Sequence, residues 1–155
     1  LKRFPELKFL DKYHYIAPLS MAMILFGLGE YMALNYSQYN TNGMELLMWG
    51  FFVSTVILYH ATFTVNSVCH VFGYRSYDTK DGSVNNWLIA ILTLGEGWHN
   101  NHHAFPNSER QGHQWYQIDI CHYILWGLSK LGIVWDIRGV PEDSVIERRY
   151  NSDVV

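Results

Sequence analysis

The chain has 155 residues, a formal net charge of −3 and a charged fraction of 16%, which leaves room for about one domain. Because an average soluble domain is roughly 25% charged, we expect no polyanion-binding surface and no nucleic-acid partner. The two cysteines, Cys69 and Cys121, form no C-x-x-C motif, and we expect both to be free thiols.

Two long apolar segments dominate the first half of the chain. The first runs from Ile16 to Tyr36 with Glu30 as its only formal charge, and the second runs from Met44 to Val65. Each is long enough to cross a hydrocarbon core about 30 Å thick at about 1.5 Å per helical residue. We therefore predict an all-α integral membrane protein with a hairpin of two transmembrane helices, over about 16–36 and 44–65. A buried helix of a soluble bundle is the alternative for the first segment, because it contains Glu30.

Basic residues flank this hairpin at its open end only. They are absent from the connector at 37–43 and occur as Lys2, Arg3, Lys8, Lys12, Arg75 and Lys80. By the positive-inside rule, both chain ends lie in the cytoplasm of a multi-pass protein. We expect a cytoplasmic, helical, histidine-rich cap over about 66–140 and a loosely held tail over 141–155. Within the cap, 86–94 is too short to span a membrane, and 115–131 has the spacing of an amphipathic helix.

The strongest motif is GEGWHNNHHAFP, over residues 95–106. His99, His102 and His103 are three and four residues apart, so on a helix they share a face and could converge on a metal ion. A solvated histidine patch is the alternative. The cluster has no thiolate and only one acid, so its imidazoles suit iron, zinc, copper or nickel.

A second polar pair, Asn66 and His70, follows the second apolar segment at i, i+4 spacing. It could contribute to the same metal site, or it could be a helix end that meets water. An imidazole-rich site against a membrane suggests metal-dependent oxidation of a lipid chain. The remaining histidines are expected to be structural or interfacial: His14, His60, His113 and His122.

The chain resembles the C-terminal portion of membrane fatty acyl desaturases of the stearoyl-desaturase type, the His-box di-iron family. The segments that carry this likeness are HATFTVNSVCHVFGYRSYD, NNWLIAILTLGEGWHNNHHAFP and QWYQIDICHYILWGLSKLGIVWDIR. The resemblance implies an oxidoreductase that uses two iron ions and O2 to remove two hydrogens from a saturated acyl chain, usually at the ninth carbon, for unsaturated fatty acid synthesis. It also implies an acyl-CoA or acyl-lipid substrate, surrounding membrane lipid, and a ferredoxin or b-type cytochrome with its reductase as electron donor.

The resemblance also assigns residues. Its implied iron ligands are His70, His99, His102 and His103, with Asn66 acting through a water. Thr62 and Phe63 match positions that line the acyl tunnel, although Phe63 stands where tryptophan is usual. Glu96 and Asp119 are the acids expected to accept hydrogen bonds from the imidazole N–H groups that point away from the metal.

The family's first two histidine boxes, H-x-x-x-x-H and H-x-x-H-H, do not occur in residues 1–59. We therefore expect this chain to be the C-terminal part of a longer protein, to supply about half of the iron ligands and to be inactive alone. It shows no appended redox domain, which favours a bacterial inner membrane over the endoplasmic reticulum. The alternatives are a related His-box hydroxylase or ketolase, and a zinc-binding or degenerate membrane module without activity.

Overall fold

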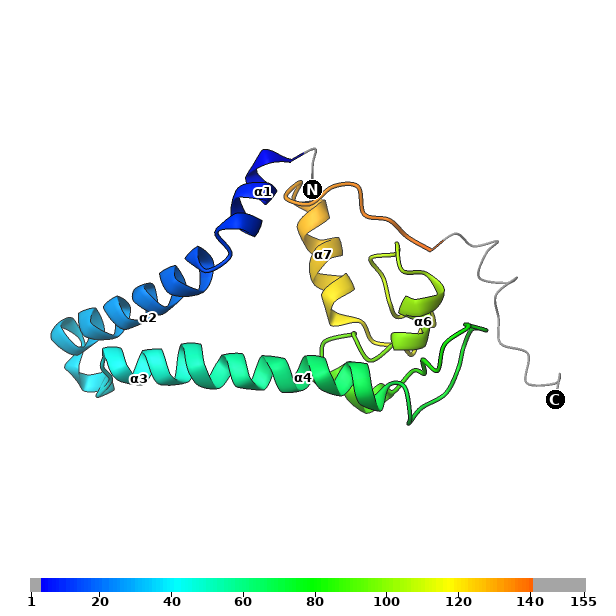
Figure 1. Ribbon diagram of the computed structural model, residues 1–155, viewed down its shortest axis with the longest axis horizontal. Helices are drawn as coiled ribbons and strands as arrows, with labels where there is room; N and C mark the ends of the chain where they lie inside the picture. The colour runs from blue at the N-terminus through cyan, green and yellow to red at the C-terminus, as the bar shows by residue number, and fades with distance from the viewer. Residues whose placement is uncertain (1–3, 141–155) are drawn as a thin grey trace. The chain divides into compact units, whose positions relative to one another are not determined.

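The computed structural model describes residues 4–140, and every regular element within them is a helix (Figure 1). The chain divides into two compact units, Leu1–Tyr59 and His60–Val155, and each is described by itself. The expected tail at 141–155 and the two chain ends lie outside the described residues. The all-α prediction is confirmed for the part of the chain that the structure describes.

The first unit is a helical hairpin preceded by a short helix. Its elements are α1 (Pro5–Lys12), α2 (Ile16–Asn35), the 3₁₀ turn η1 (Ser37–Tyr39), α3 (Gly43–Leu47), the π-helical segment η2 (Met48–Val53) and the start of α4 (Ser54–Val68). The last three form one uninterrupted helix of 26 residues. Figure 1 shows α2 and α3 side by side, joined by the η1 turn.

Two helices are long and apolar enough to cross a membrane, Ile16–Asn35 and Gly43–Val68. In their most apolar windows only 6% and 0% of the residues are buried inside the protein. A core helix of a soluble bundle would be mostly buried, so this exposure argues against the soluble alternative. Large apolar side chains instead point outward, as lipid-facing residues do: Leu19, Met23, Ile24, Leu34, Trp49, Ile57 and Leu58. The prediction of two helices that are long and apolar enough to span a membrane is confirmed.

Close backbone contact holds the tip of this hairpin together. A Cβ atom on Gly29 would lie 2.5 Å from the carbonyl oxygen of Asn42, and one on Gly43 would lie 2.8 Å from that of Phe26. The Gly43 N–H donates to Oε1 of Glu30 at 3.0 Å. The single charge of the first apolar segment therefore caps the start of α3, where one of the free N–H groups of a helix needs an acceptor.

The second unit contains the end of α4, the helices α5 (Trp87–Leu92), α6 (His99–Ala104) and α7 (Ile120–Lys130), and the loops between them. Two small apolar clusters support it, Val65 with Cys69 and Ile89, and Tyr77 with Ala104 and Phe105. Its interior is unusually polar. The buried polar side chains are Ser83, Asn85, His99, Asn100, Asn101, Gln117 and Asp119.

Side-chain caps set where two helices of this unit begin. The amphipathic helix expected over 115–131 starts only at Ile120, because Asp119 accepts a hydrogen bond from the His122 N–H at 3.0 Å and is the N-cap. Asn86 caps α5 in the same way, through the Ile89 N–H at 3.1 Å. The cap residue, rather than the apolar periodicity, therefore decides each boundary.

The hairpin tip yields a test with a matched control. Gly29→Ala should lower the free energy of unfolding of the hairpin by about 1–3 kcal/mol, because its methyl group meets backbone that cannot move aside. Gly27→Ala places its methyl in open space and should be neutral or slightly stabilising. Unfolding in sodium dodecyl sulfate, followed by circular dichroism, measures both, and equal losses would contradict the close packing.

Candidate metal centre

Three imidazoles from two segments converge in the second unit. Nε2 of His70 and Nε2 of His103 each lie 3.1 Å from Nε2 of His99. All three ligand atoms lie within 4.8 Å of one another. Two nitrogen ligands that each lie about 2.1 Å from the same ion are about 3.0–3.4 Å apart when the ligand–metal–ligand angle is about 90–109°. The two spacings to His99 therefore fit ligands of a single ion, and an imidazole donor set suits iron, zinc or copper.

The helix α6 carries two of these ligands, and it is only six residues long. His99 and His103 are one turn apart on it, as their spacing predicted. The residue before α6, Trp98, makes no side-chain cap. Asn85 caps the helix from outside, because its Oδ1 accepts from Asn100 N–H at 3.0 Å and Asn101 N–H at 3.2 Å. A loop residue thus stabilises a helix that would not persist alone.

The opposite face of α6 is amide-rich and fully buried. Asn100 Oδ1 accepts from the N–H groups of Ser76 and Tyr77 at 2.8 Å each. Asn101 Nδ2 donates to Gln111 O at 2.7 Å and to Gln117 Oε1 at 2.9 Å. These bonds tie α6 to the loops before and after it, so the histidine face is held in place from behind.

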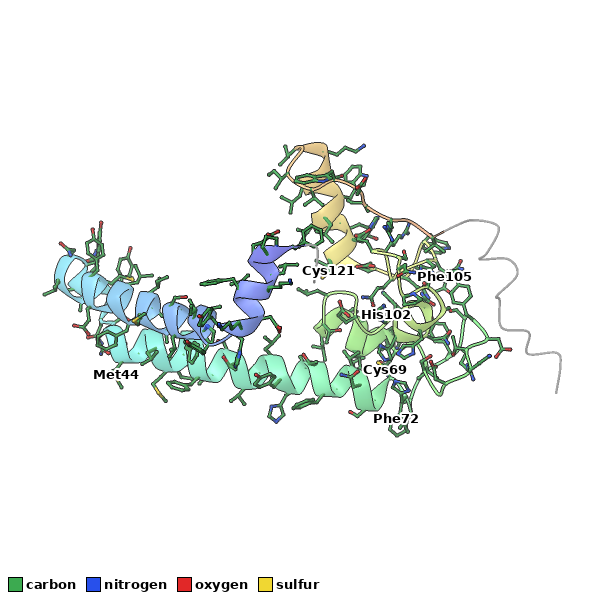
Figure 2. The ribbon with its side chains drawn as sticks, turned by 45° about the horizontal axis from the view of Figure 1, so that its top comes forward. Met44, Cys69, Phe72, His102, Phe105 and Cys121 are labelled. Carbon is green, nitrogen blue, oxygen red and sulfur yellow. The ribbon has the colours of Figure 1, made fainter. Side chains whose placement is uncertain are left out.

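His70 reaches the cluster from just beyond the end of α4, not from within a helix. The chain leaves the helix there because Cys69 O accepts from Val84 N–H at 2.8 Å, and His70 N–H bonds to Ser67 O at 3.1 Å. The expected i, i+4 helical pair with Asn66 is therefore not formed as such. Figure 2 labels Cys69, next to His70 at this helix end, and His102 on α6.

Asp81 holds the outward nitrogen of one ligand. Its Oδ2 lies 2.6 Å from Nδ1 of His103. Burial raises the pKa of this carboxyl, but hydrogen bonds from Ser83, His103 and Thr79 outweigh it and hold the pKa well below the ordinary range. Asp81 is therefore an acceptor near neutral pH, in the carboxylate–histidine arrangement that orients metal ligands in proteins.

The central imidazole of the cluster, His99, is held in its neutral form. Burial of His99, followed by repulsion from protons on His103, His70 and His102, lowers the pKa of His99 to about 4. A nitrogen lone pair is therefore available for a cation at neutral pH. The donor set present fits a bound transition-metal ion.

The other predicted site residues take different positions. The His102 ring lies on the same helix, 6.1 Å from that of His99 and 5.8 Å from that of His103 between centroids, and His102 is outside the converging trio. Asn66 is exposed, and its Nδ2 donates to Thr62 O at 3.1 Å. Thr62 and Phe63 are exposed on α4.

The two acids expected to orient the imidazoles have other surroundings. Glu96 is exposed. Asp119 is buried, and its carboxylate accepts from the N–H groups of Gln111, Gly112 and His122. Among the described residues, the carboxylate that bonds a histidine of the converging trio is Asp81.

The remaining histidines and both thiols stay outside the cluster. His113 bonds the Tyr77 hydroxyl at 2.9 Å, and His122 bonds Glu109 at 3.0 Å. His14 and His60 are exposed in the hairpin helices and their flank. Cys69 and Cys121 are free, and burial raises the pKa of the Cys69 thiol to about 11, which leaves it protonated and unreactive.

Sequence reasoning missed Asp81, Asn85, Asn100 and Asn101. The two asparagines inside the histidine motif were a usable signal, because polar residues between ligands on a short helix must face some other polar partner. Asp81 and Asn85 carried no local signal. Each acts on α6 through contacts between residues 15 to 22 positions apart.

The chain is similar to proteins of one known family over most of its length. The fatty acid desaturase family model matches residues 3–137. The chain belongs to the fatty acid desaturase family. The predicted resemblance is confirmed, and desaturases are oxidoreductases of lipid chains.

Curated relatives of this desaturase chain differ in the reactions that their names state. It is 37% identical over 99% of its length to the palmitoyl-monogalactosyldiacylglycerol delta-7 desaturase of Arabidopsis thaliana, covering 38% of that protein. It is 50% identical over 68% of its length to the acyl-CoA 5-desaturase of Anemone leveillei, and 38% identical over 86% of its length to the sn-1 stearoyl-lipid 9-desaturase of Anabaena variabilis. It covers 32% and 44% of those two proteins, so it spans less than half the length of each of these relatives.

The capping role of Asn85 can be measured directly. Asn85→Ala leaves two buried N–H groups of α6 without an acceptor, at about 1–3 kcal/mol each. We expect amide hydrogen exchange across His99–Ala104 to accelerate by at least tenfold. Asn107→Ala, at an exposed position nearby, is the control and should leave exchange unchanged. Unaltered protection in the Asn85 variant would show that α6 does not depend on this cap.

Proposed function

We propose that this chain forms part of the iron site of a membrane enzyme that desaturates fatty acyl chains with O2. The observation that carries the proposal is the convergence of His70, His99 and His103 in a member of the fatty acid desaturase family. Two apolar helices in the same chain supply the membrane attachment that a lipid substrate requires.

The proposal includes two iron ions with different ligand shares. The three converging imidazoles would hold one ion, with Asn66 contributing through a water. His102 lies on the same short helix but outside the converging trio, so we assign it to the second ion. Bound iron would supply the oxygen-dependent oxidation of an unreactive C–H bond. The chain's own contribution is to keep His99 neutral and to hold α6 in place from behind with a buried amide network.

This chain does not supply all the ligands that two ions need. Four histidines and one asparagine are the candidates here, whereas the family resemblance implies two further histidine boxes. We therefore propose that activity requires ligands beyond those of residues 1–155. The chain alone would then be a ligand-holding part of the site and not an active enzyme.

The substrate we propose is a saturated acyl chain, carried on CoA or in a lipid. Names among the relatives include both carriers, and they include a stearoyl-lipid 9-desaturase, which supports reaction at the ninth carbon. Thr62 and Phe63 remain the predicted tunnel residues. We propose that the metal site faces the cytoplasm, in a bacterial inner membrane, and receives electrons from a ferredoxin or a b-type cytochrome with its reductase.

A zinc module is the second candidate, since three imidazoles with open positions are also a zinc ligand set. Product and metal analysis separate the candidates. The test protein is the gene product that holds this chain together with the expected histidine boxes.

We expect that protein to convert a saturated acyl chain to a product with one double bond and no added oxygen. His99→Ala should reduce the product at least a hundredfold, because it removes the central ligand. His14→Ala, at an exposed histidine outside the cluster, should leave the yield within twofold. Mass spectrometry of the extracted acyl chains measures both. A hydroxylated or keto product would reassign the reaction, and zinc with no product would favour the module.

The incomplete ligand set predicts a metal count. The purified 155-residue chain, loaded with Fe²⁺ without oxygen, should retain fewer than two irons. When O2, a reductant and a saturated acyl substrate are then added, it should make no unsaturated product. Its retained iron should fall further in His70→Ala, whereas His113→Ala should not change it. Iron assay after gel filtration gives the count. Two tightly held irons with desaturation would refute the proposed need for other ligands.

A further inference from the structure

One metal-binding histidine differs from its two partners in how its ring is held. His103 directs Nε2 toward the cluster and Nδ1 toward Oδ2 of Asp81, 2.6 Å away. For the rings of His70 and His99, the hydrogen bonds found among residues 4–140 join ring nitrogen to ring nitrogen and involve no carboxylate. The three ligands are therefore not equivalent.

We propose that Asp81 is a positioning residue that makes His103 a competent metal ligand, an inference that rests on the proposed function. A neutral imidazole carries its single proton on one of its two nitrogens. The Asp81 carboxylate can only accept, so it draws this proton to Nδ1. Nε2 is then left with a free lone pair, and the ring is aimed at the metal.

Further contacts of Asp81 prevent it from turning away. Its Oδ1 accepts from Ser83 N–H and from Thr79 Oγ1, both at 3.0 Å, and also from the Ser83 hydroxyl. Ser83 is fully buried, and its carbonyl oxygen accepts from Asn100 Nδ2 at 3.2 Å. The loop that carries Asp81 is thus attached to the same helix as His103, so carboxylate and imidazole are held in register.

Because of these contacts, Asp81→Asn is more informative than Asp81→Ala, which removes the whole carboxylate. In Asp81→Asn, the three donors around Oδ1 keep the amide oxygen on their side. The amide NH2 then faces Nδ1 of His103, which must accept. The imidazole proton is forced to Nε2, the nitrogen that should bind metal. The loop is kept but the ligand is disabled.

The experiment compares metal binding in Asp81→Asn, Asp81→Ala and the wild-type chain. The probe is Co²⁺ added to the 155-residue chain in detergent and followed by its visible absorption. We expect Asp81→Asn to weaken Co²⁺ binding by about 10–100-fold, and more than Asp81→Ala does. A purely structural role predicts the reverse order, because alanine removes every loop hydrogen bond and asparagine keeps several.

Two controls complete the design. Asp78→Asn removes a nearby charge whose carboxylate lies 3.8 Å from Arg75 and is largely exposed, and it should change Co²⁺ affinity by less than twofold. Nitrogen-15 NMR of the metal-free chain should show the His103 proton on Nδ1 in the wild type and on Nε2 in Asp81→Asn.

The possible outcomes are distinct. Wild-type affinity in Asp81→Asn, the structural order of the two variants, or an unchanged tautomer would overturn the role of Asp81 and leave the metal site standing. Absence of Co²⁺ binding by the wild-type chain would overturn the proposed metal site, and the role of Asp81 with it.

Discussion

The centre depends on one side chain that supplies hydrogen-bond acceptors to a very short helix. A helix of six residues has too few internal hydrogen bonds to offset the cost of its first turn. The oxygen of Asn85 accepts from two N–H groups of α6, and its amide donates to Asn101 and Ser76. Without these bonds, His99 and His103 would have no fixed spacing and the three Nε2 atoms would not meet.

The two faces of α6 have opposite requirements, and the chain meets both with polar residues. Buried amides must find every partner they can, because an unpaired buried polar group costs about 1–3 kcal/mol. Asn100 and Asn101 satisfy this by bonding to both flanking loops. The ring nitrogens of His70, His99 and His103 face one another, and burial followed by repulsion from the neighbouring imidazoles lowers the pKa of His99 to about 4. The amide face therefore provides rigidity, and the imidazole face provides lone pairs for a cation.

Features that depend on residues close together in the sequence could be predicted from it. Apolar length predicted both membrane helices, and the spacing of His99 and His103 predicted their shared helical face. The route of His70 into the cluster was harder, because it depends on a turn fixed by Val84 bonding back to Cys69 O. Asp81 could not be predicted, since a DGS turn looks like any surface turn until the fold brings it against His103. Glu96 adjoins the histidine motif in the sequence but is exposed, and Asp119 is buried but accepts from backbone N–H groups.

The names of the relatives show that members of one family act at different carbons of the acyl chain. A metal site determines what can be oxidised, whereas the carbon that reaches it is determined by the walls around the acyl chain. The relatives' names give positions 5, 7 and 9, although each relative matches this chain at 37–50% identity. A network of buried amides tolerates little change, because each substitution leaves a partner unsatisfied. Thr62 and Phe63, by contrast, are exposed on α4. In the proposed function these two side chains line the acyl path, so we expect changes of bond position to arise there, while the loops around α6 hold the three converging imidazoles in place.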